Sequence, residues 1–161
     1  MDGGSPVVTL RPVDAGSWRD VARLTVAAGQ ERFVAAPTYY LTMCAYDDVW
    51  HPMSVHDADG SVVGFLMWGI DEADGSCWLG GVLVDARHQG RGVGRAAVLE
   101  ALRMLREHRG ASEFALSYDP DNSVAKGLYA SLGFAETGEV DEGEVVARLS
   151  TGPDAGRPGT A

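Results

Sequence analysis

The chain has 161 residues, 45% of them hydrophobic, and 23 acidic against 13 basic residues give it a formal net charge of −10. These values fit one globular domain, disfavour a nucleic-acid partner and are compatible with a cationic substrate. Cys44 and Cys77 are too few for a disulfide framework. With no signal peptide and no run of 18 apolar residues, we expect a cytoplasmic protein that does not engage a membrane.

The first half of the chain predicts a strand, a helix, a second short helix or turn, and a two-stranded hairpin. In chain order they cover residues 7–13, 17–28, 37–46, 53–56 and 61–70. The first helix depends on the spacing of Val21, Leu24 and Ala28, and Gly29 is its expected end. The turn Asp59-Gly60 is typical of a hairpin.

The second half predicts a strand, a long helix, another strand, a shorter helix and two closing strands. They cover residues 77–84, 92–107, 113–118, 122–132, 134–138 and 145–149. Asn122 is the expected N-cap of the shorter helix, and Gly133 its stop. The order β-α-α-β-β-β-α-β-α-β-β predicts a mixed α/β sheet in one domain over residues 7–149. Flexible tails are expected at residues 1–6 and 150–161.

Residues 82–96 form an apolar strand that runs into a basic, glycine-rich turn and then directly into a helix. Helix N-termini present free backbone N–H groups and partial positive charge, and glycines let the backbone approach a phosphate closely. The spacing of Gly90, Gly92 and Gly94 does not fit a dinucleotide fingerprint, because Arg95 stands where a third glycine is needed. The ending of a P-loop is missing as well. Three arginines add permanent positive charge to this anion site: Arg87, Arg91 and Arg95.

Two motifs together indicate a family. The stretch Gln89-Gly90-Arg91-Gly92-Val93-Gly94 resembles the acetyl-CoA pyrophosphate loop of the GNAT superfamily of N-acetyltransferases. Residues 122–134, N-S-V-A-K-G-L-Y-A-S-L-G-F, are similar to that family's second signature. The resemblance covers residues 7–149. It implies the GNAT fold, a mixed and mostly antiparallel sheet with a central splayed pair of parallel strands and flanking helices.

The resemblance also implies acetyl-CoA as cosubstrate and assigns residues to it. The strand backbone would pair with the pantetheine arm, and one of its N–H groups would polarise the thioester carbonyl. The turn would hold the pyrophosphate, while Asn122 would bond the pantetheine arm or act only as a helix cap. The implied cofactor-binding residues are Val82, Leu83, Val84, Gln89, Gly90, Arg91, Gly92, Val93, Gly94, Arg95 and Asn122. No metal is expected, because the four histidines show no ligand spacing.

Acetyl transfer to an amine requires a proton to leave the ammonium group and a proton to reach the departing thiolate. By resemblance Tyr129 is the general acid, although an aromatic on a helix face can simply be core. Polyamine acetyltransferases often carry a carboxylate base where this chain has Gly80 and Gly81. We therefore take Glu31, acting through water, as the candidate base, and the two glycines as room for a bulky amine. Other routes are capture of neutral amine or water chains to Asp71 or Glu72.

Segments 29–35, 116–122 and 138–146 resemble bacterial diamine and spermine/spermidine acetyltransferases. Glu31, Asp119 and the acidic run 139–144 could hold ammonium groups. Aromatic side chains could add cation–π contacts: Tyr39, Tyr40, Trp50 and Trp68. The leading hypothesis is an acetyl-CoA-dependent N-acetyltransferase for a primary amine of a small polyamine-like substrate, with a homodimer as the assembly that the resemblance implies. The alternatives are a protein lysine or N-terminus, an antibiotic amine, or a non-catalytic acyl-CoA sensor.

Overall fold

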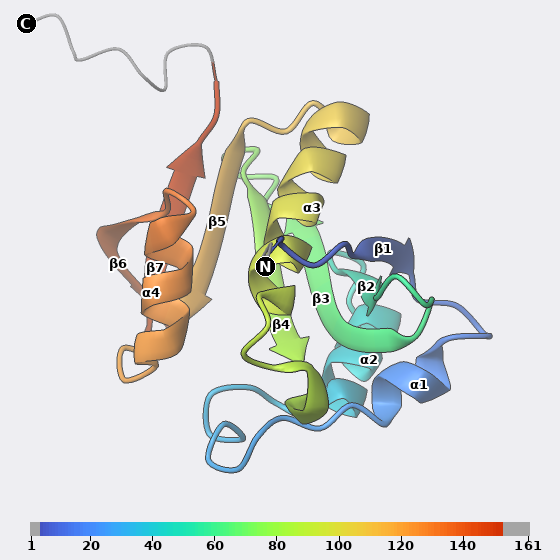
Figure 1. Ribbon diagram of the computed structural model, residues 1–161. Coiled ribbons are helices and arrows are strands. Elements are labelled where there is room, and N and C mark those ends of the chain that lie inside the picture. The colour runs from blue at the N-terminus through green and yellow to red at the C-terminus, as the bar shows by residue number, and fades with distance from the viewer. Residues whose placement is uncertain (1–3, 153–161) are drawn as a thin grey trace, which may run out of the picture.

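Seven strands form one mixed sheet in the computed structural model, which describes residues 4–152 (Figure 1). The strands are β1 (Thr9–Pro12), β2 (His51–His56), β3 (Val62–Ile70), β4 (Cys77–Val84), β5 (Glu113–Tyr118), β6 (Ala135–Asp141) and β7 (Glu144–Ser150). The helices are α1 (Trp18–Ala22), α2 (Pro37–Tyr46), α3 (Val93–Arg109) and α4 (Ser123–Ser131), with a short 3-10 helix η1 (Ala86–His88) before α3. The spatial order of the strands is β1-β2-β3-β4-β5-β7-β6, and β4-β5 is the parallel pair in this sheet. The predicted α/β class, the order of elements and the central parallel pair are confirmed.

The first helix is much shorter than predicted. We expected residues 17–28, but α1 ends at Ala22, and Gly29 lies beyond it in a separate turn at φ +88°. The reason is that Thr25 uses its backbone elsewhere. Its N–H donates to Asp85 Oδ1 at 3.2 Å, and its carbonyl accepts from the Ala86 N–H at 2.7 Å. Tertiary hydrogen bonds thus replace the helical bonds that the apolar spacing suggested.

The closing hairpin is longer than predicted. The expected strands 134–138 and 145–149 become β6, which reaches Asp141, and β7, which starts at Glu144. Glu142 and Gly143 form a two-residue turn with positive φ at both positions, a geometry that matches the twist of paired strands. Most of the expected tails, 1–6 and 150–161, falls outside the described residues.

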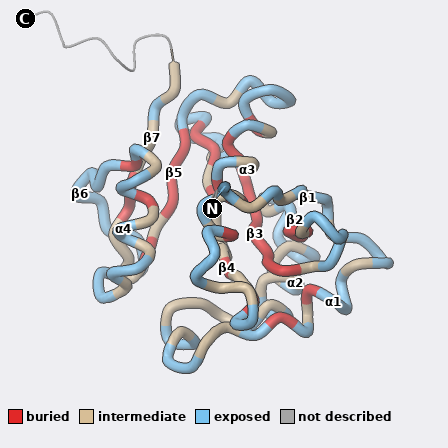
Figure 2. The backbone as a smooth tube through the Cα atoms, viewed as in Figure 1, coloured by how far each residue is buried: buried red, intermediate tan, exposed pale blue. Residues whose placement is uncertain are grey.

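The sheet separates two hydrophobic cores, and its strands β3 and β5 are buried along most of their length (Figure 2). The larger core lies between the sheet and α3, with α4 beside it, and includes Leu79, Leu105 and Phe114. The smaller core lies on the other face, where α1 and α2 pack, and includes Val21, Phe65 and Leu83. We call these the α3 face and the α2 face. No helix in residues 4–152 is long and apolar enough to cross a membrane.

The parallel strands β4 and β5 diverge soon after they begin (Figure 1). Cys77 pairs with Phe114 and Trp78 with Ala115, and the described strands share no ladder pair beyond these. A bulge in β4 adds to the divergence. Phe65 opposes Leu83 and Met67 opposes Gly80, so two residues of β4 face one residue of β3. Gly81 lies in this bulge at φ +58°. The end of β4 therefore presents a backbone edge toward β5 with no neighbouring strand.

Candidate active site

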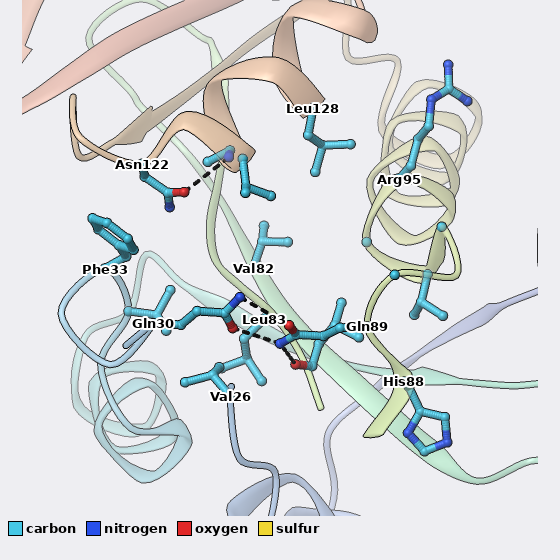
Figure 3. Close-up of a pocket in the computed structure, with 18 of the residues that line it drawn as sticks. Val26, Gln30, Phe33, Val82, Leu83, His88, Gln89, Arg95, Asn122 and Leu128 are labelled. Atoms are coloured by element: carbon cyan, nitrogen blue, oxygen red, sulfur yellow. Dashed lines mark hydrogen bonds between the residues drawn. The ribbon is translucent and has the colours of Figure 1, made fainter. Parts of the chain in front are cut away.

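A cavity of about 480 Å³ opens beside the free edge of β4 (Figure 3). Its walls come from the segment between α1 and α2, the end of β4, the turn into α3 and the first turns of α4. The cavity brings together residues of both motifs that are distant in sequence. The predicted residues that line it are Val82, Leu83, Val84, Gln89, Gly90, Gly92, Val93, Gly94, Arg95, Asn122 and Tyr129.

The glycine-rich turn is shaped for an anion. Gly90 and Gly92 have φ values of +75° and +83°, a region that side chains other than glycine rarely adopt. Gly92 is the N-cap of α3, and no side chain caps this helix, whose first turn carries no acidic residue. Its first N–H groups thus remain available to a ligand.

The arginines of this turn differ in their surroundings. Arg95 lines the cavity, whereas Arg91 is exposed and does not line it. Neither forms a salt bridge with a described residue, so both positive charges are available. Arg87 is already committed, because its Nε lies 2.9 Å from Asp85 Oδ2.

A pair of glutamines joins the segment before α2 to this turn (Figure 3). Gln30 Nε2 donates to Gln89 Oε1 at 3.1 Å, and Gln89 Nε2 donates to Gln30 Oε1 at 2.8 Å. Gln89 Nε2 also donates to the Val84 carbonyl at 2.9 Å, and the Ala27 N–H donates to Gln30 Oε1 at 3.1 Å. This amide pair holds Phe33 and its neighbours against the cavity. Sequence reasoning missed Gln30, because nothing near it in the chain indicates its partner.

Asp85 supports the same junction from inside the protein. It is 2% exposed and receives hydrogen bonds from Arg87 Nε at 2.9 Å and from the Thr25 N–H at 3.2 Å. Burial alone would raise the pKa of Asp85, but these hydrogen bonds outweigh burial and hold the pKa below its usual range. The ionised carboxylate thus fixes both the start of the turn and the chain after α1.

Asn122 has capacity for both roles considered for it. Its side-chain oxygen accepts from the Ala125 N–H at 3.1 Å, which caps α4 as predicted. Its amide nitrogen has no hydrogen-bond partner among the described residues, and the side chain lines the cavity. The cap consumes the acceptor and leaves the donor for a ligand.

Tyr129 lies deep in the protein with its hydroxyl uncommitted. Its ring is 7% exposed, stacks on Tyr118 at 5.7 Å and meets Phe134 edge-on at 6.0 Å. Tyr129 lines the cavity, and within residues 4–152 no group hydrogen-bonds to its hydroxyl. Burial, and then the negative charge of Glu144, raise the pKa of Tyr129 above its usual value. The hydroxyl is therefore protonated at neutral pH and can donate.

None of the three base candidates lines this cavity. Glu31 is exposed, its carboxylate accepts from the Gly29 N–H at 2.8 Å, and it does not line the cavity. Asp71 and Glu72 lie in the turn between β3 and β4, at the opposite end of β4 from Val82. The structure thus brings Tyr129 and the turn together, and none of the three carboxylates lines the cavity with them.

The expected free space at the two glycines is wrong. A Cβ atom on Gly80 would lie 3.1 Å from Met67 Cε, and one on Gly81 would lie 3.3 Å from the Tyr40 ring. The ring of Trp50 also stands 3.4 Å from a Cβ on Gly80. These glycines are needed because aromatic side chains pack directly on the strand, so they accommodate the protein itself rather than a bulky amine.

The four predicted aromatic residues do not form one cation site. Tyr40 and Trp50 pack into the smaller core, and Tyr39 is 60% exposed. Trp68 is buried in the larger core, where its ring stacks on His51 and carries Arg109 at 5.0 Å. Trp68 therefore already has a cation from its own chain.

The acidic residues near the β6–β7 turn divide into two groups. Glu139 is paired with Arg148, whose Nε lies 3.0 Å away, so it is not free to hold an ammonium group. The other carboxylates form no salt bridge with described residues; we call them the acidic patch, and they are Asp119, Asp141, Glu142 and Glu144. Metal binding has no support in residues 4–152, where no three His, Cys, Asp or Glu side chains are grouped to hold an ion.

Comparison with known proteins gives matches in sequence and in fold. The family model described as acetyltransferase (GNAT) family matches residues 18–134. The spermine/spermidine N(1)-acetyltransferase of Bacillus subtilis (strain 168) is 34% identical over 89 residues, which cover 52% of this chain and 59% of that protein. The mycothiol acetyltransferase of Salinispora tropica is 38% identical over 82 residues, 49% of this chain and 27% of that protein. The chain thus spans well under two thirds of these relatives.

Among solved structures, the spermidine N-acetyltransferase of Vibrio cholerae in complex with CoA and spermine has a TM-score of 0.69. It shares 20% sequence identity, and the match covers 88% of this chain and 93% of that chain. The likeness at this identity concerns the fold.

Proposed function

Because the chain belongs to the acetyltransferase (GNAT) family, we propose that it transfers the acetyl group of acetyl-CoA directly to a primary amine of a small polyamine-like substrate. The observation that carries this proposal is the cavity, which gathers the glycine-rich turn, Asn122 and Tyr129 along an unpaired strand edge. A ligand there would meet an anion site at one end and a protonated hydroxyl at the other.

The residues fit the donor, acetyl-CoA, in three parts. The free N–H groups before and within the first turn of α3, with Arg91 and Arg95 nearby, would hold the pyrophosphate. The unpaired edge of β4 and the amide nitrogen of Asn122 would bind the pantetheine arm. The thioester supplied by the donor would then lie toward Tyr129.

In the proposed reaction the amine attacks the thioester directly, so the protein forms no covalent intermediate. A backbone N–H at the end of β4 would stabilise the oxyanion that forms when the amine attacks the thioester carbonyl. Tyr129 would donate its proton to the departing thiolate, and its buried, neutral state suits that role. The uncommitted hydroxyl agrees with this assignment better than with a purely packing role.

A cationic acceptor fits the charges of the chain. The acidic patch lies where β5 and β6 end and β7 begins, without a cation from the described chain to neutralise it. A di- or polyamine carries positive charges at spaced positions, so one amine can react while another is held by a carboxylate. The net charge of −10 would further concentrate such a substrate near the protein.

The test is release of CoA thiol from acetyl-CoA with spermidine, spermine and diamines, beside aminoglycosides and lysine peptides. We expect turnover with the polyamines. Turnover restricted to lysine peptides or aminoglycosides would show that the acceptor is one of these and not a polyamine. Acetyl-CoA binding without any transfer would favour a non-catalytic sensor.

Tyr129→Phe provides the matching test of the acid. We expect kcat to fall by about 100-fold, in the range of general acid–base effects, with acetyl-CoA affinity unchanged within twofold. Tyr46→Phe is the control, because Tyr46 is 87% exposed on α2. Full activity in Tyr129→Phe would remove the tyrosine from the mechanism.

A further inference from the structure

Glu144, the first residue of β7, faces the side of the sheet opposite α3. Side chains alternate along a strand, and Val145, Ala147 and Leu149 of β7 pack against the larger core on the α3 face. Glu144 and Val146 therefore project from the α2 face. That is the face on which Tyr40 of α2 packs, beside the bulge of β4.

Two tyrosines surround Glu144 from different elements. The ring of Tyr40 stacks on Phe65 at 6.0 Å, and its hydroxyl accepts from the Ala35 N–H at 3.0 Å, so its own proton is free to donate. Tyr129 approaches from α4; the residue is 7% exposed, and its hydroxyl has no partner in the described chain. Its ring stacks at 5.7 Å on Tyr118, which pairs with Val145, the neighbour of Glu144 on β7. Glu144 is the charged group that acts most strongly on the Tyr129 hydroxyl, and it also acts on Tyr40. One carboxylate thus lies near both hydroxyls, at the gap between β4 and β5.

The surroundings of Glu144 favour proton uptake. It is partly buried, forms no salt bridge with a described residue, and three other carboxylates repel its charge. Burial first, and these neighbours second, raise the pKa of Glu144 above its usual value. The groups that face it are Tyr40 from α2, Tyr129 from α4, Asp119 after β5, and Asp141 and Glu142 at the β6–β7 turn.

We propose that Glu144 is the general base that takes a proton from the acceptor ammonium group. This rests on the proposed function and fills the role that Gly80 and Gly81 leave open on β4. The unpartnered hydroxyl of Tyr129 marks where the leaving sulfur would lie. Glu144 does not line the cavity itself; from the α2 side of the same gap it would meet the amine that attacks from the side opposite the donor.

The step balances as follows. The ammonium gives one proton to the Glu144 carboxylate, and the freed lone pair forms the N–C bond to the thioester carbonyl carbon. The C–S bond then breaks, and Tyr129 gives its proton to the thiolate. The second proton on nitrogen passes to the Tyr129 oxygen, and Glu144 releases its proton to water, so that the products are an amide, CoA and one proton.

The experiment is the pH profile of kcat/KM for Glu144→Gln with the amine on which the wild type is most active. Glutamine keeps the shape and removes the base. At pH 7 we expect a loss of about 100-fold. Because an alkylamine has a pKa of about 10.4, its neutral fraction grows with pH, and the loss should shrink to below about 10-fold by pH 9. Calorimetry should give acetyl-CoA affinity within twofold of wild type, which also shows that the variant is folded.

Glu113→Gln is the matched control. Glu113 is the exposed first residue of β5, at the far end of the same β5–β7 ladder. The pH profile of kcat/KM for Glu113→Gln should follow that of the wild type. Wild-type activity in Glu144→Gln, a loss of equal size at every pH, or a change in amine KM alone would overturn the base assignment while the proposed function stands. A wild type that acetylates no amine would instead overturn both.

Discussion

The proposed donor side and the proposed acceptor side of the gap between β4 and β5 are built in opposite ways. The donor side is a short stretch of contiguous chain, residues 82–95, fixed by local geometry and by hydrogen bonds to Gln30 and Thr25. The acceptor side is assembled from α2, α4 and the start of β7, and its carboxylates repel one another. The donor side is therefore stabilised without ligand, whereas the acceptor side gains from a cation. This difference is the general one between a site for a constant cosubstrate and a site that selects a substrate.

The largest expected effect comes from breaking the donor side at Gly92. Its φ of +83° at the N-cap of α3 is strained for any residue with a branched side chain. We expect Gly92→Val to weaken acetyl-CoA binding by about 100-fold, because the turn can no longer aim its N–H groups at the pyrophosphate. Calorimetry with acetyl-CoA measures this.

The control for that change is Gly127→Ala. Gly127 is in α4, and a Cβ there meets nothing within 4 Å, so acetyl-CoA affinity should stay within twofold of wild type. Unchanged affinity in Gly92→Val would show that the turn is only a connection between strand and helix.

The next effect concerns stability on the donor side, at Asp85. Removing the charge of this buried anchor with Asp85→Asn should lower the free energy of unfolding by about 2 kcal/mol at pH 7. The reason is that the Arg87 guanidinium would lose its hydrogen bond to a charged carboxylate. The folded pKa of Asp85 is below its unfolded value, so the contribution is present above the unfolded pKa of about 3.9 and is lost as pH falls through the folded pKa. Denaturation curves at several pH values test this.

Asp20→Asn is the comparison for Asp85→Asn. Asp20 also pairs with an arginine, Arg23, but both side chains are exposed, and we expect a change below about 0.5 kcal/mol. If the two variants lose equal stability, or if the loss at Asp85 does not shrink as pH falls below about 3.9, the carboxylate of Asp85 is not the anchor.

The same contrast explains how far the sequence could be read. The turn and α4 are signalled by glycines, a cap and an apolar period within a few residues, so the order of elements was predictable and most boundaries were close. The predicted length of α1 was wrong because the Thr25 N–H donates to Asp85, sixty residues later in the chain. Gly80 and Gly81 were misread as empty space because the side chains that fill it are distant in sequence: Met67 and Trp50 at Gly80, and Phe65 and Tyr40 at Gly81.

The acceptor carboxylate shows the same limit. The run 139–144 is visible as acidic in the sequence, but the sequence does not distinguish its members. The pairing of β6 with β7 brings Glu139 to Arg148, whereas Glu144 forms no salt bridge with a described residue. Periodicity cannot supply such a distinction, because it depends on which element packs over each face of the sheet.

The smallest expected effect tests the link between the two sides, the pair of Gln30 and Gln89. In a double-mutant cycle, Gln30→Ala and Gln89→Ala should each lower stability, and the pair should show a coupling energy of about 1 kcal/mol, because the side chains exchange two hydrogen bonds. Gln30 has no place in the glycine-rich motif but lines the cavity beside Gln89. An effect of Gln30→Ala on acetyl-CoA affinity therefore passes through Gln89 only if it disappears in the Gln89→Ala background. Additive effects on stability and no change in affinity would mean that the donor turn holds its shape alone. A measured coupling would mean that the segment that carries Phe33 is positioned by the donor side, so that the two sides differ in construction but share one support.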